Sequence, residues 1–319
     1  MKLFYYQRPD GQPNFGDELN HWLWPKLCGE STLFDDDAST TFLGTGTLLN
    51  NQLKSRIPAA RRIVIFGTGA GYEQPLKQLP ATWDIQCVRG PFSARLLGLE
   101  PHKAITDGGL LVSQVFKPAQ TTRSGYSFMP HIHSAHAAAE CWQRICQEAN
   151  IRYIDPRWPI EEVLNAIASS EGLLAEAMHG AIVADALRVP WIPVTSSPRI
   201  YAFKWQDWCA SMGLPYLPHR LPSLEDYPRW GRGLRSGSLS MRHWLRASLE
   251  SAVTTAQYAL FSDERAIVSR LKTVAKQQPY LSAESTFSTK LDSLQTCFDQ
   301  FISNSENLKS SSVSACTTV

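Results

Sequence analysis

Short apolar runs alternate with longer segments of helical period along the first two thirds of the chain, and few folds are compatible with this pattern. Runs of four or five β-branched or aromatic residues indicate strands, whereas apolar residues three or four apart indicate helices. Their alternation is typical of a parallel sheet with crossover helices. In the first 120 residues the predicted strands are 3–6, 40–43, 62–66 and 85–88, and the predicted helices are 17–27, 47–54 and 91–97.

The alternation restarts near residue 126. We predict strands at 126–129, 152–155, 172–175 and 191–194, and helices at 134–148 (capped by Ser134), 159–169, 180–187 and 201–212. The predicted fold is therefore α/β, with two Rossmann-like units, residues 1–120 and 121–218, facing each other across a cleft. In such folds the ligand binds at the carboxyl ends of the strands, so we expect the functional site in this cleft.

The composition and the pattern of the sequence change beyond residue 218. Residues 219–302 are predicted to form a Pro- and Arg-rich loop and a helical extension, and the serine-rich tail 303–319 is predicted to be disordered. Five arginines in this region form a local basic stretch, Arg229, Arg232, Arg235, Arg242 and Arg246. A solvated loop explains them simply, but they also suit contact with an anionic membrane surface.

Composition excludes several classes of protein. The chain has 31 Lys and Arg against 29 Asp and Glu, so it lacks the basic excess that binding to nucleic acid requires. No run of about 18 apolar residues predicts a membrane span, and no signal peptide is apparent, so we expect a cytoplasmic protein. The seven cysteines are scattered, which favours reduced thiols. The ten tryptophans suit either a core or a surface that stacks on sugars or partners.

Glycines cluster directly after predicted strands. Gly67 and Gly69 follow the strand at 62–66, and the run Gly44-Thr45-Gly46 follows the strand at 40–43. Glycine lets backbone amides approach a ligand closely, although a tight turn explains each of these positions equally well. The spacing does not match a dinucleotide fingerprint. Together the clusters favour a ligand that carries phosphate or carboxylate groups.

Polar residues in the first unit fall at the same predicted edge. Asp17 suits the N-cap of the first helix, and with Asn14 it could instead bind a polyol. Arg89 ends a strand and offers a fork for carboxylate or phosphate, unless it forms a structural ion pair. Asp107 ends the next strand, so it is a candidate partner for Arg89 or a general base. Ser93 lies in the helix that begins at Pro91.

The second unit contributes histidines and a lysine. His179 lies between a strand and a helix, and a helix N-terminus favours a neutral imidazole that acts as an acid, a base or a donor to an anion. His131 and His133 form an H-x-H pair without further ligands at metal spacing, so we expect His131 to be a polar residue of the cleft and predict no metal. Lys204 supplies another cation for an anionic ligand.

Six short segments stand out together along the chain. They are Asn14-Phe15-Gly16-Asp17, Gly67-Thr68-Gly69, Val88-Arg89-Gly90-Pro91-Phe92-Ser93, Thr106-Asp107-Gly108-Gly109, Phe128-Met129-Pro130-His131 and Met178-His179-Gly180-Ala181. In this order they resemble the segments of polysaccharide pyruvyl transferases, and the chain looks most like the bacterial exopolysaccharide branch, the succinoglycan-type ketal pyruvate transferases. The resemblance covers about residues 1–215. It has two departures: Ala177 occupies a position where many members carry arginine, and the region after residue 220 matches nothing.

This resemblance implies a fold similar to GT-B glycosyltransferases, phosphoenolpyruvate as donor substrate, and a cyclic pyruvate ketal on a sugar as product. It implies no cofactor. The acceptor would be a polysaccharide or a lipid-linked precursor, with the possibility of peripheral contact at the inner face of the membrane. The implied roles are acid/base catalysis by His179, orientation of Arg89 or activation of a hydroxyl by Asp107, anion binding by Arg89 and Lys204, and substrate binding by Asn14, Asp17, Ser93, His131, Gly67 and Gly69.

Two other functions stay compatible with the sequence. A nucleotide-sugar glycosyltransferase uses the same architecture, because fold alone does not decide function. A non-catalytic carbohydrate-binding protein of a polysaccharide assembly complex would account for the many tryptophans.

Overall fold

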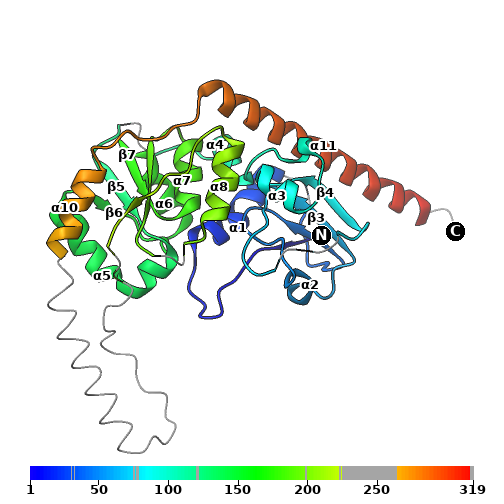
Figure 1. Ribbon diagram of the computed structural model, residues 1–319. Coiled ribbons are helices and arrows are strands. Elements are labelled where there is room, and N and C mark those ends of the chain that lie inside the picture. The colour runs from blue at the N-terminus through cyan, green and yellow to red at the C-terminus, as the bar shows by residue number, and fades with distance from the viewer. Residues whose placement is uncertain are drawn as a thin grey trace, which may run out of the picture.

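The computed structural model describes residues 1–224 and 264–316, with ten single positions left out of the first range (Glu30, Thr32, Pro75, Lys77, Gln78, Gln120, Thr121, Pro198, Arg199 and Ser223). Two parallel sheets lie side by side with helices packed around them (Figure 1). The α/β class predicted from the sequence is therefore confirmed. The Arg229–246 stretch lies outside the described residues.

The first sheet has the strand order β1-β2-β3-β4, and all of its pairs are parallel. β2 and β3 are buried along almost their whole length, as is typical of parallel strands covered on both faces. The strands are β1 (Lys2–Phe4), β2 (Thr40–Leu43), β3 (Arg62–Phe66) and β4 (Trp83–Cys87), and the helices of this unit are α1 (Phe15–Cys28), α2 (Leu53–Arg56), α3 (Pro91–Leu96) and α4 (Val112–Val115).

The second sheet has the strand order β6-β5-β7-β8-β9, again with parallel pairs. The chain leaves β5 toward β6 and then returns to place β7 on the other side of β5. The sheet therefore has a topological switch point between β5 and β7. The strands are β5 (Tyr126–Met129), β6 (Arg152–Tyr153), β7 (Gly172–Ala175), β8 (Trp191–Thr195) and β9 (His219–Arg220), and the helices are α5 (Ile132–Ala149), α6 (Ile160–Ala168), α7 (Met178–Ala186) and α8 (Ala202–Ser211).

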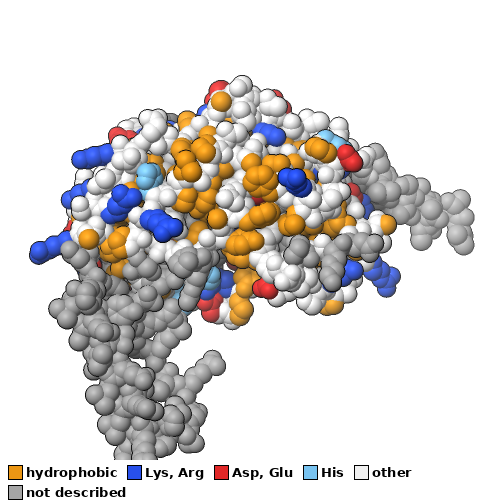
Figure 2. Space-filling view, in the orientation of Figure 1, with side chains coloured by type: hydrophobic (Ala, Val, Ile, Leu, Met, Phe, Trp, Pro, Cys, Tyr) orange, Lys and Arg blue, Asp and Glu red, His pale blue; other side chains and the backbone are white. Residues whose placement is uncertain are grey.

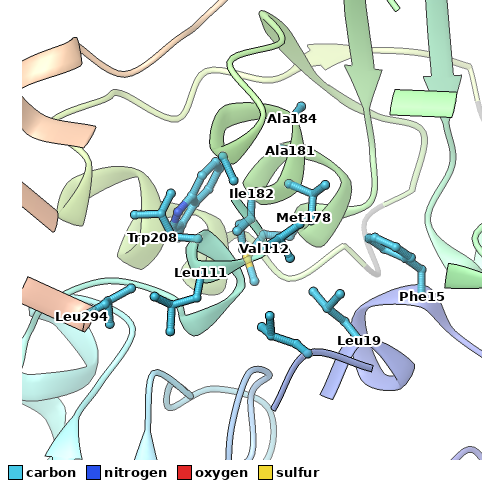
Figure 3. Close-up of a cluster of buried hydrophobic side chains, with 14 of the residues drawn as sticks. Phe15, Leu19, Leu111, Val112, Met178, Ala181, Ile182, Ala184, Trp208 and Leu294 are labelled. Atoms are coloured by element: carbon cyan, nitrogen blue, oxygen red, sulfur yellow. The ribbon is translucent and has the colours of Figure 1, made fainter. Parts of the chain in front are cut away.

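A continuous hydrophobic core joins the two units. Leu19 of α1 and Leu111 of the 3₁₀ turn Gly108–Leu111 face Ile182 of α7 and Trp208 of α8 (Figure 3). All four side chains are fully buried. Trp24, Trp142, Trp191, Trp205 and Trp208 are likewise buried, so within the described part of the chain the tryptophans serve mainly as core.

Two helices follow the second sheet. α10 (Glu264–Val274) packs against α5, and α11 (Glu284–Cys316) runs back from the second unit along the first (Figure 1). Phe298 of α11 contacts the rings of Trp24 and Phe66, at centroid distances of 5.6 and 5.3 Å. No helix in the described residues is both long and apolar enough to cross a membrane.

Several boundaries differ from the prediction. The tail predicted to be disordered from residue 303 continues α11 as far as Cys316, because adding a residue to an existing helix costs little once the preceding turns are packed. α5 begins at Ile132 with His131 as its N-cap, so Ser134 is not the cap. The helix predicted at 47–54 is reduced to α2, since Leu49 instead pairs as an extended residue with Ala70.

Candidate functional site

A pocket of about 370 Å³ lies at the carboxyl end of the second sheet, beside the switch point between β5 and β7. Segments of both units line it, including the loops after β1, β2 and β3 and the starts of α5 and α7. This is where ligands bind in open parallel sheets. Five of the residues predicted from the sequence line the pocket, namely Asn14, Asp17, His131, His179 and Lys204.

Three helix N-termini meet at this pocket. α1 begins after Asn14, α5 after His131, and α7 with Met178, and first-turn residues of each helix belong to the lining. The unpaired amides and partial positive charge of a helix N-terminus favour an anion. Asn14, not Asp17, is the N-cap of α1, and its amide nitrogen donates to Oδ2 of Asp17 at 2.6 Å. The arrangement favours a ligand with more than one anionic group.

His179 is the second residue of α7, and its ring lines the pocket with 14% of the side chain exposed. Its buried Nε2 lies 3.7 Å from Oδ2 of the fully buried Asp107, and neither atom has a hydrogen-bond partner among the described residues. The other oxygen of Asp107 accepts from the backbone of Gly109 at 2.9 Å, which fixes the carboxylate. Asp107 is thus placed to stabilise a protonated His179, as a carboxylate does in catalytic acid/base pairs.

Gly16 explains how His179 comes so close to α1. A Cβ atom at residue 16 would lie 2.1 Å from Nδ1 of His179, far inside the van der Waals contact distance. The glycine in the first turn of α1 is therefore required for the imidazole to occupy the junction of the two units.

His131 caps α5 and is almost fully buried. Its Nδ1 accepts from the backbone N–H of His133 at 3.3 Å, so the proton of the neutral ring resides on Nε2. Burial, together with the positive charges of Lys204, His133 and Arg8, holds the pKa of His131 well below its ordinary value. His131 is therefore neutral at physiological pH and can donate a hydrogen bond from Nε2.

This lowered pKa predicts a pH-dependent stability. The unfolded chain protonates His131 near pH 6.5 while the folded protein does not, so the unfolded state binds more protons and stability falls as the pH drops below about 6.5. We expect the unfolding free energy of the wild type to decrease more steeply between pH 7 and pH 5 than that of His131→Gln, measured by urea titration. His21→Gln, at an exposed position on α1, should keep the wild-type slope; equal slopes in all three proteins would contradict the assignment.

Glu176 follows β7 and was not recognised from the sequence. It is fully buried, and its oxygens accept from the backbone N–H of Ser196 at 2.6 Å and of His131 at 2.9 Å. Burial raises the pKa of this carboxyl group, whereas these hydrogen bonds oppose the rise. Glu176 thus ties together the ends of β5, β7 and β8. The sequence signal that could have identified Glu176 is its position directly after a predicted strand and three residues before His179.

Lys204 reaches the pocket from α8 of the second unit. Only 8% of the residue is exposed, and its Nζ donates to the hydroxyl of Tyr72, in the first unit, at 2.9 Å. An ammonium group with one fixed partner keeps two further N–H donors for a ligand. Within the described chain, Arg8 and Arg56 add positive charge to the lining, and Asp17 and Glu73 add negative charge.

The structure does not bring Arg89 to the pocket. Its guanidinium is fully buried and donates to Oδ2 of Asp207 at 3.0 Å, to Oγ1 of Thr47 at 2.8 Å, and to the carbonyl oxygens of Gly46 and Ala70. The suggestion that Asp107 orients Arg89 is wrong, because the partner is Asp207. Arg89 instead supports the Gly46–Thr47 backbone, which lines the pocket.

Ser93, Gly67 and Gly69 do not line the pocket either. Ser93 accepts from the backbone of Ala70 and donates to Asp207. A Cβ at Gly69 would meet the Arg89 guanidinium at 2.3 Å, and one at Gly67 would meet the backbone nitrogen of Gly108 at 2.5 Å. The two glycines allow close packing against Arg89 and Gly108, and of the predicted glycine clusters it is Gly46 that lines the pocket.

Comparisons with known proteins confirm the family resemblance. A family model for polysaccharide pyruvyl transferase matches residues 27–198. The succinoglycan biosynthesis protein ExoV of Rhizobium meliloti (strain 1021) is 41% identical over 226 residues, which cover 70% of this chain and 68% of the relative. No solved structure matches the chain. The family match over more than half of the sequence, together with this relative, shows that the chain belongs to the polysaccharide pyruvyl transferase family.

Proposed function

We propose that this protein transfers the enolpyruvyl group of phosphoenolpyruvate to two hydroxyls of one sugar, in an exopolysaccharide or its lipid-linked precursor, and so forms a cyclic pyruvate ketal. The observation that carries the proposal is the meeting of three helix N-termini with His131, His179 and Lys204 at one pocket. In this proposal the two units act as a GT-B-like pair, and the reaction takes place in the cytoplasm, at the inner membrane face when the acceptor is lipid-linked.

The donor requires two anion-binding positions. Phosphoenolpyruvate carries a carboxylate and a phosphate on the same carbon, so both must be bound within one small pocket. The helix amides, the Nε2–H of His131 and the ammonium of Lys204 supply donors for both groups. Such donors are fixed before the substrate arrives, so little reorganisation is needed when charge moves during the reaction.

The chemistry needs one acid/base in two steps. In the first, protonated His179 gives its proton to the methylene carbon, and a sugar hydroxyl attacks the adjacent carbon and loses its proton. In the second, the C–O bond to phosphate breaks with its electron pair, and a second hydroxyl of the same sugar attacks and loses its proton. Two hydroxyl protons are released, one is incorporated in the methyl group, and the other leaves on hydrogen phosphate. Asp107 stabilises the imidazolium form of His179 between proton transfers.

Substrate consumption tests this function. The protein is mixed with phosphoenolpyruvate and oligosaccharides obtained from succinoglycan by mild acid, which removes ketals. The expected result is phosphate release that depends on the oligosaccharide and yields an acid-labile carboxylate on a sugar. Release of a nucleotide from a sugar nucleotide, with phosphoenolpyruvate unused, would identify a glycosyltransferase. Oligosaccharide binding without consumption of either donor would identify a non-catalytic protein.

Replacing Lys204 by methionine should weaken donor binding. Lys204 lines the pocket and is almost fully buried, so its ammonium group is placed to meet an anionic donor directly. A charge-assisted hydrogen bond contributes about 1.5–3 kcal/mol, so we expect the KM for phosphoenolpyruvate to rise about 10- to 100-fold. Steady-state kinetics measure this value, with the exposed Lys117→Met as the matched control. An unchanged KM in Lys204→Met would remove Lys204 from the donor site.

A further inference from the structure

Four aromatic side chains lead away from the pocket across α3 and α8. The rings of Tyr72, Tyr201, Phe203 and Phe92 follow one another at centroid distances of 5.1, 6.0 and 6.4 Å. Tyr72 lines the pocket, whereas Phe92 lies on α3 at the other end. We refer to these four residues as the aromatic strip.

The strip is open to solvent. Tyr72, Tyr201 and Phe92 are 37%, 39% and 39% exposed, and Phe203 is half-buried between them. Leu96, on the same helix as Phe92, is 43% exposed. Figure 2 shows hydrophobic side chains gathered over the region where α3 and α8 pack together. A contiguous exposed apolar surface of this kind marks a place where something binds.

The backbone that positions the Tyr72 ring, at the pocket end of the strip, is strained. After Gly71, Tyr72 and Glu73 adopt φ angles of 49° and 51°, in the left-handed region that residues with a side chain seldom occupy. A Cβ at Gly71 would lie 3.0 Å from the Tyr201 ring. This backbone sets Tyr72 nearly parallel to Tyr201, with an interplanar angle of 28°, and its hydroxyl accepts from Lys204. The first ring of the strip is therefore fixed to the donor-binding lysine.

We propose that the aromatic strip binds the acceptor glycan, so that sugars neighbouring the reacting one stack on these rings while the reacting sugar enters the pocket. The proposal rests on the proposed function. Sugar rings present flat C–H faces that pack on aromatic side chains, and tyrosine adds a hydroxyl for the sugar's polar edge. The spacing of the rings is comparable to the length of one hexose unit. A lipid bilayer fits less well, because a membrane seated on the strip would cover the pocket that Tyr72 lines.

The test uses the two rings farthest from the reacting atoms. Phe203→Ala and Phe92→Ala are assayed with ketal-free succinoglycan oligosaccharides of graded length. We expect the KM of long acceptors to rise about three- to tenfold, whereas the KM of the shortest acceptor, the KM for phosphoenolpyruvate and kcat stay unchanged. Phe203→Trp should retain the wild-type KM. The matched control is Leu217→Ala, another exposed hydrophobic residue, at 68% exposure, that is not part of the strip. Thermal unfolding checks that each variant is folded.

A second measurement separates failure of this proposal from failure of the proposed function. Saturation-transfer NMR with the same oligosaccharides, without phosphoenolpyruvate, reports glycan contact directly. If both variants still transfer the pyruvyl group with an unchanged acceptor KM, the aromatic strip does not bind the acceptor, and the proposed function stands. If the wild type binds the glycan but never consumes phosphoenolpyruvate, and both variants lose this binding, the role of the strip is supported and the proposed function is wrong. If the variants lose only their binding to anionic phospholipid vesicles, or the wild type binds no glycan, the proposal is wrong.

Discussion

The variant His179→Ala is expected to lose transfer activity by about 10²- to 10⁴-fold in kcat, the range typical for removal of a general acid/base. The reason is positional as well as chemical. His179 lines the pocket from the first turn of α7, and its Nε2 faces the buried Asp107 at 3.7 Å. In the proposed mechanism the same imidazole serves both steps of ketal formation, so its removal should slow both of them. Phosphate release from phosphoenolpyruvate in the presence of acceptor measures the loss.

The matched control is His21→Ala, since His21 is an exposed histidine on α1 and lies outside the pocket lining. Asp107→Asn separates positioning from chemistry. It keeps the size of the side chain but removes the charge opposite His179, so kcat should fall with little change in the KM for phosphoenolpyruvate. Near-normal turnover in His179→Ala would show that another residue protonates the donor.

Removing one partner of the Arg89–Asp207 ion pair should destabilise the whole molecule. Both side chains are fully buried, and they join the segment directly before α3 in the first unit to α8 in the second. Asp207 also accepts from the backbone N–H groups of Phe92 and Ser93 at 2.9 Å. Loss of one partner of a buried pair leaves an uncompensated charge, which costs about 3–5 kcal/mol. We expect Arg89→Met to lose this much unfolding free energy in urea titration.

Two further variants test whether the loss of stability comes from an unpaired buried charge. The double variant Arg89→Met/Asp207→Asn should lose less than the sum of the single losses, because no buried charge is left alone. Arg62→Met breaks the partly exposed pair with Asp84 and should cost no more than about 1 kcal/mol. Equal losses in Arg89→Met and Arg62→Met would mean that burial of the first pair has no energetic consequence.

The strands were predictable because their side chains are uniformly buried. Residues 40–43, 62–66, 126–129 and 172–175 match observed strands residue for residue. Position after a strand was also enough to predict that His131 and His179 reach one pocket. Local pattern succeeds at these places because a parallel sheet gathers the carboxyl ends of neighbouring strands at one edge.

The partners of those residues were not predictable, because they depend on contacts between distant parts of the chain. Arg89 and Asp207 are separated by 118 positions, and Lys204 and Tyr72 by 132. An arginine at a strand end suits an anion or an ion pair equally, and only the packing of α3 on α8 decides between them. The helical tail escaped prediction for a related reason, since α11 depends on the first sheet for its apolar contacts.

The return of α11 to the first sheet also orders events during translation. The aromatic group of Trp24, Phe42 and Phe66 is completed by Phe298 and Phe301. Roughly 230 residues separate Phe66 from Phe298, and at about 5–20 residues per second a ribosome takes on the order of 10 to 50 s to make them. In this interval the nascent first unit exposes aromatic surface that its own strands and helices do not fully cover. The aromatic core of the first unit is therefore completed only after α11 has left the ribosome.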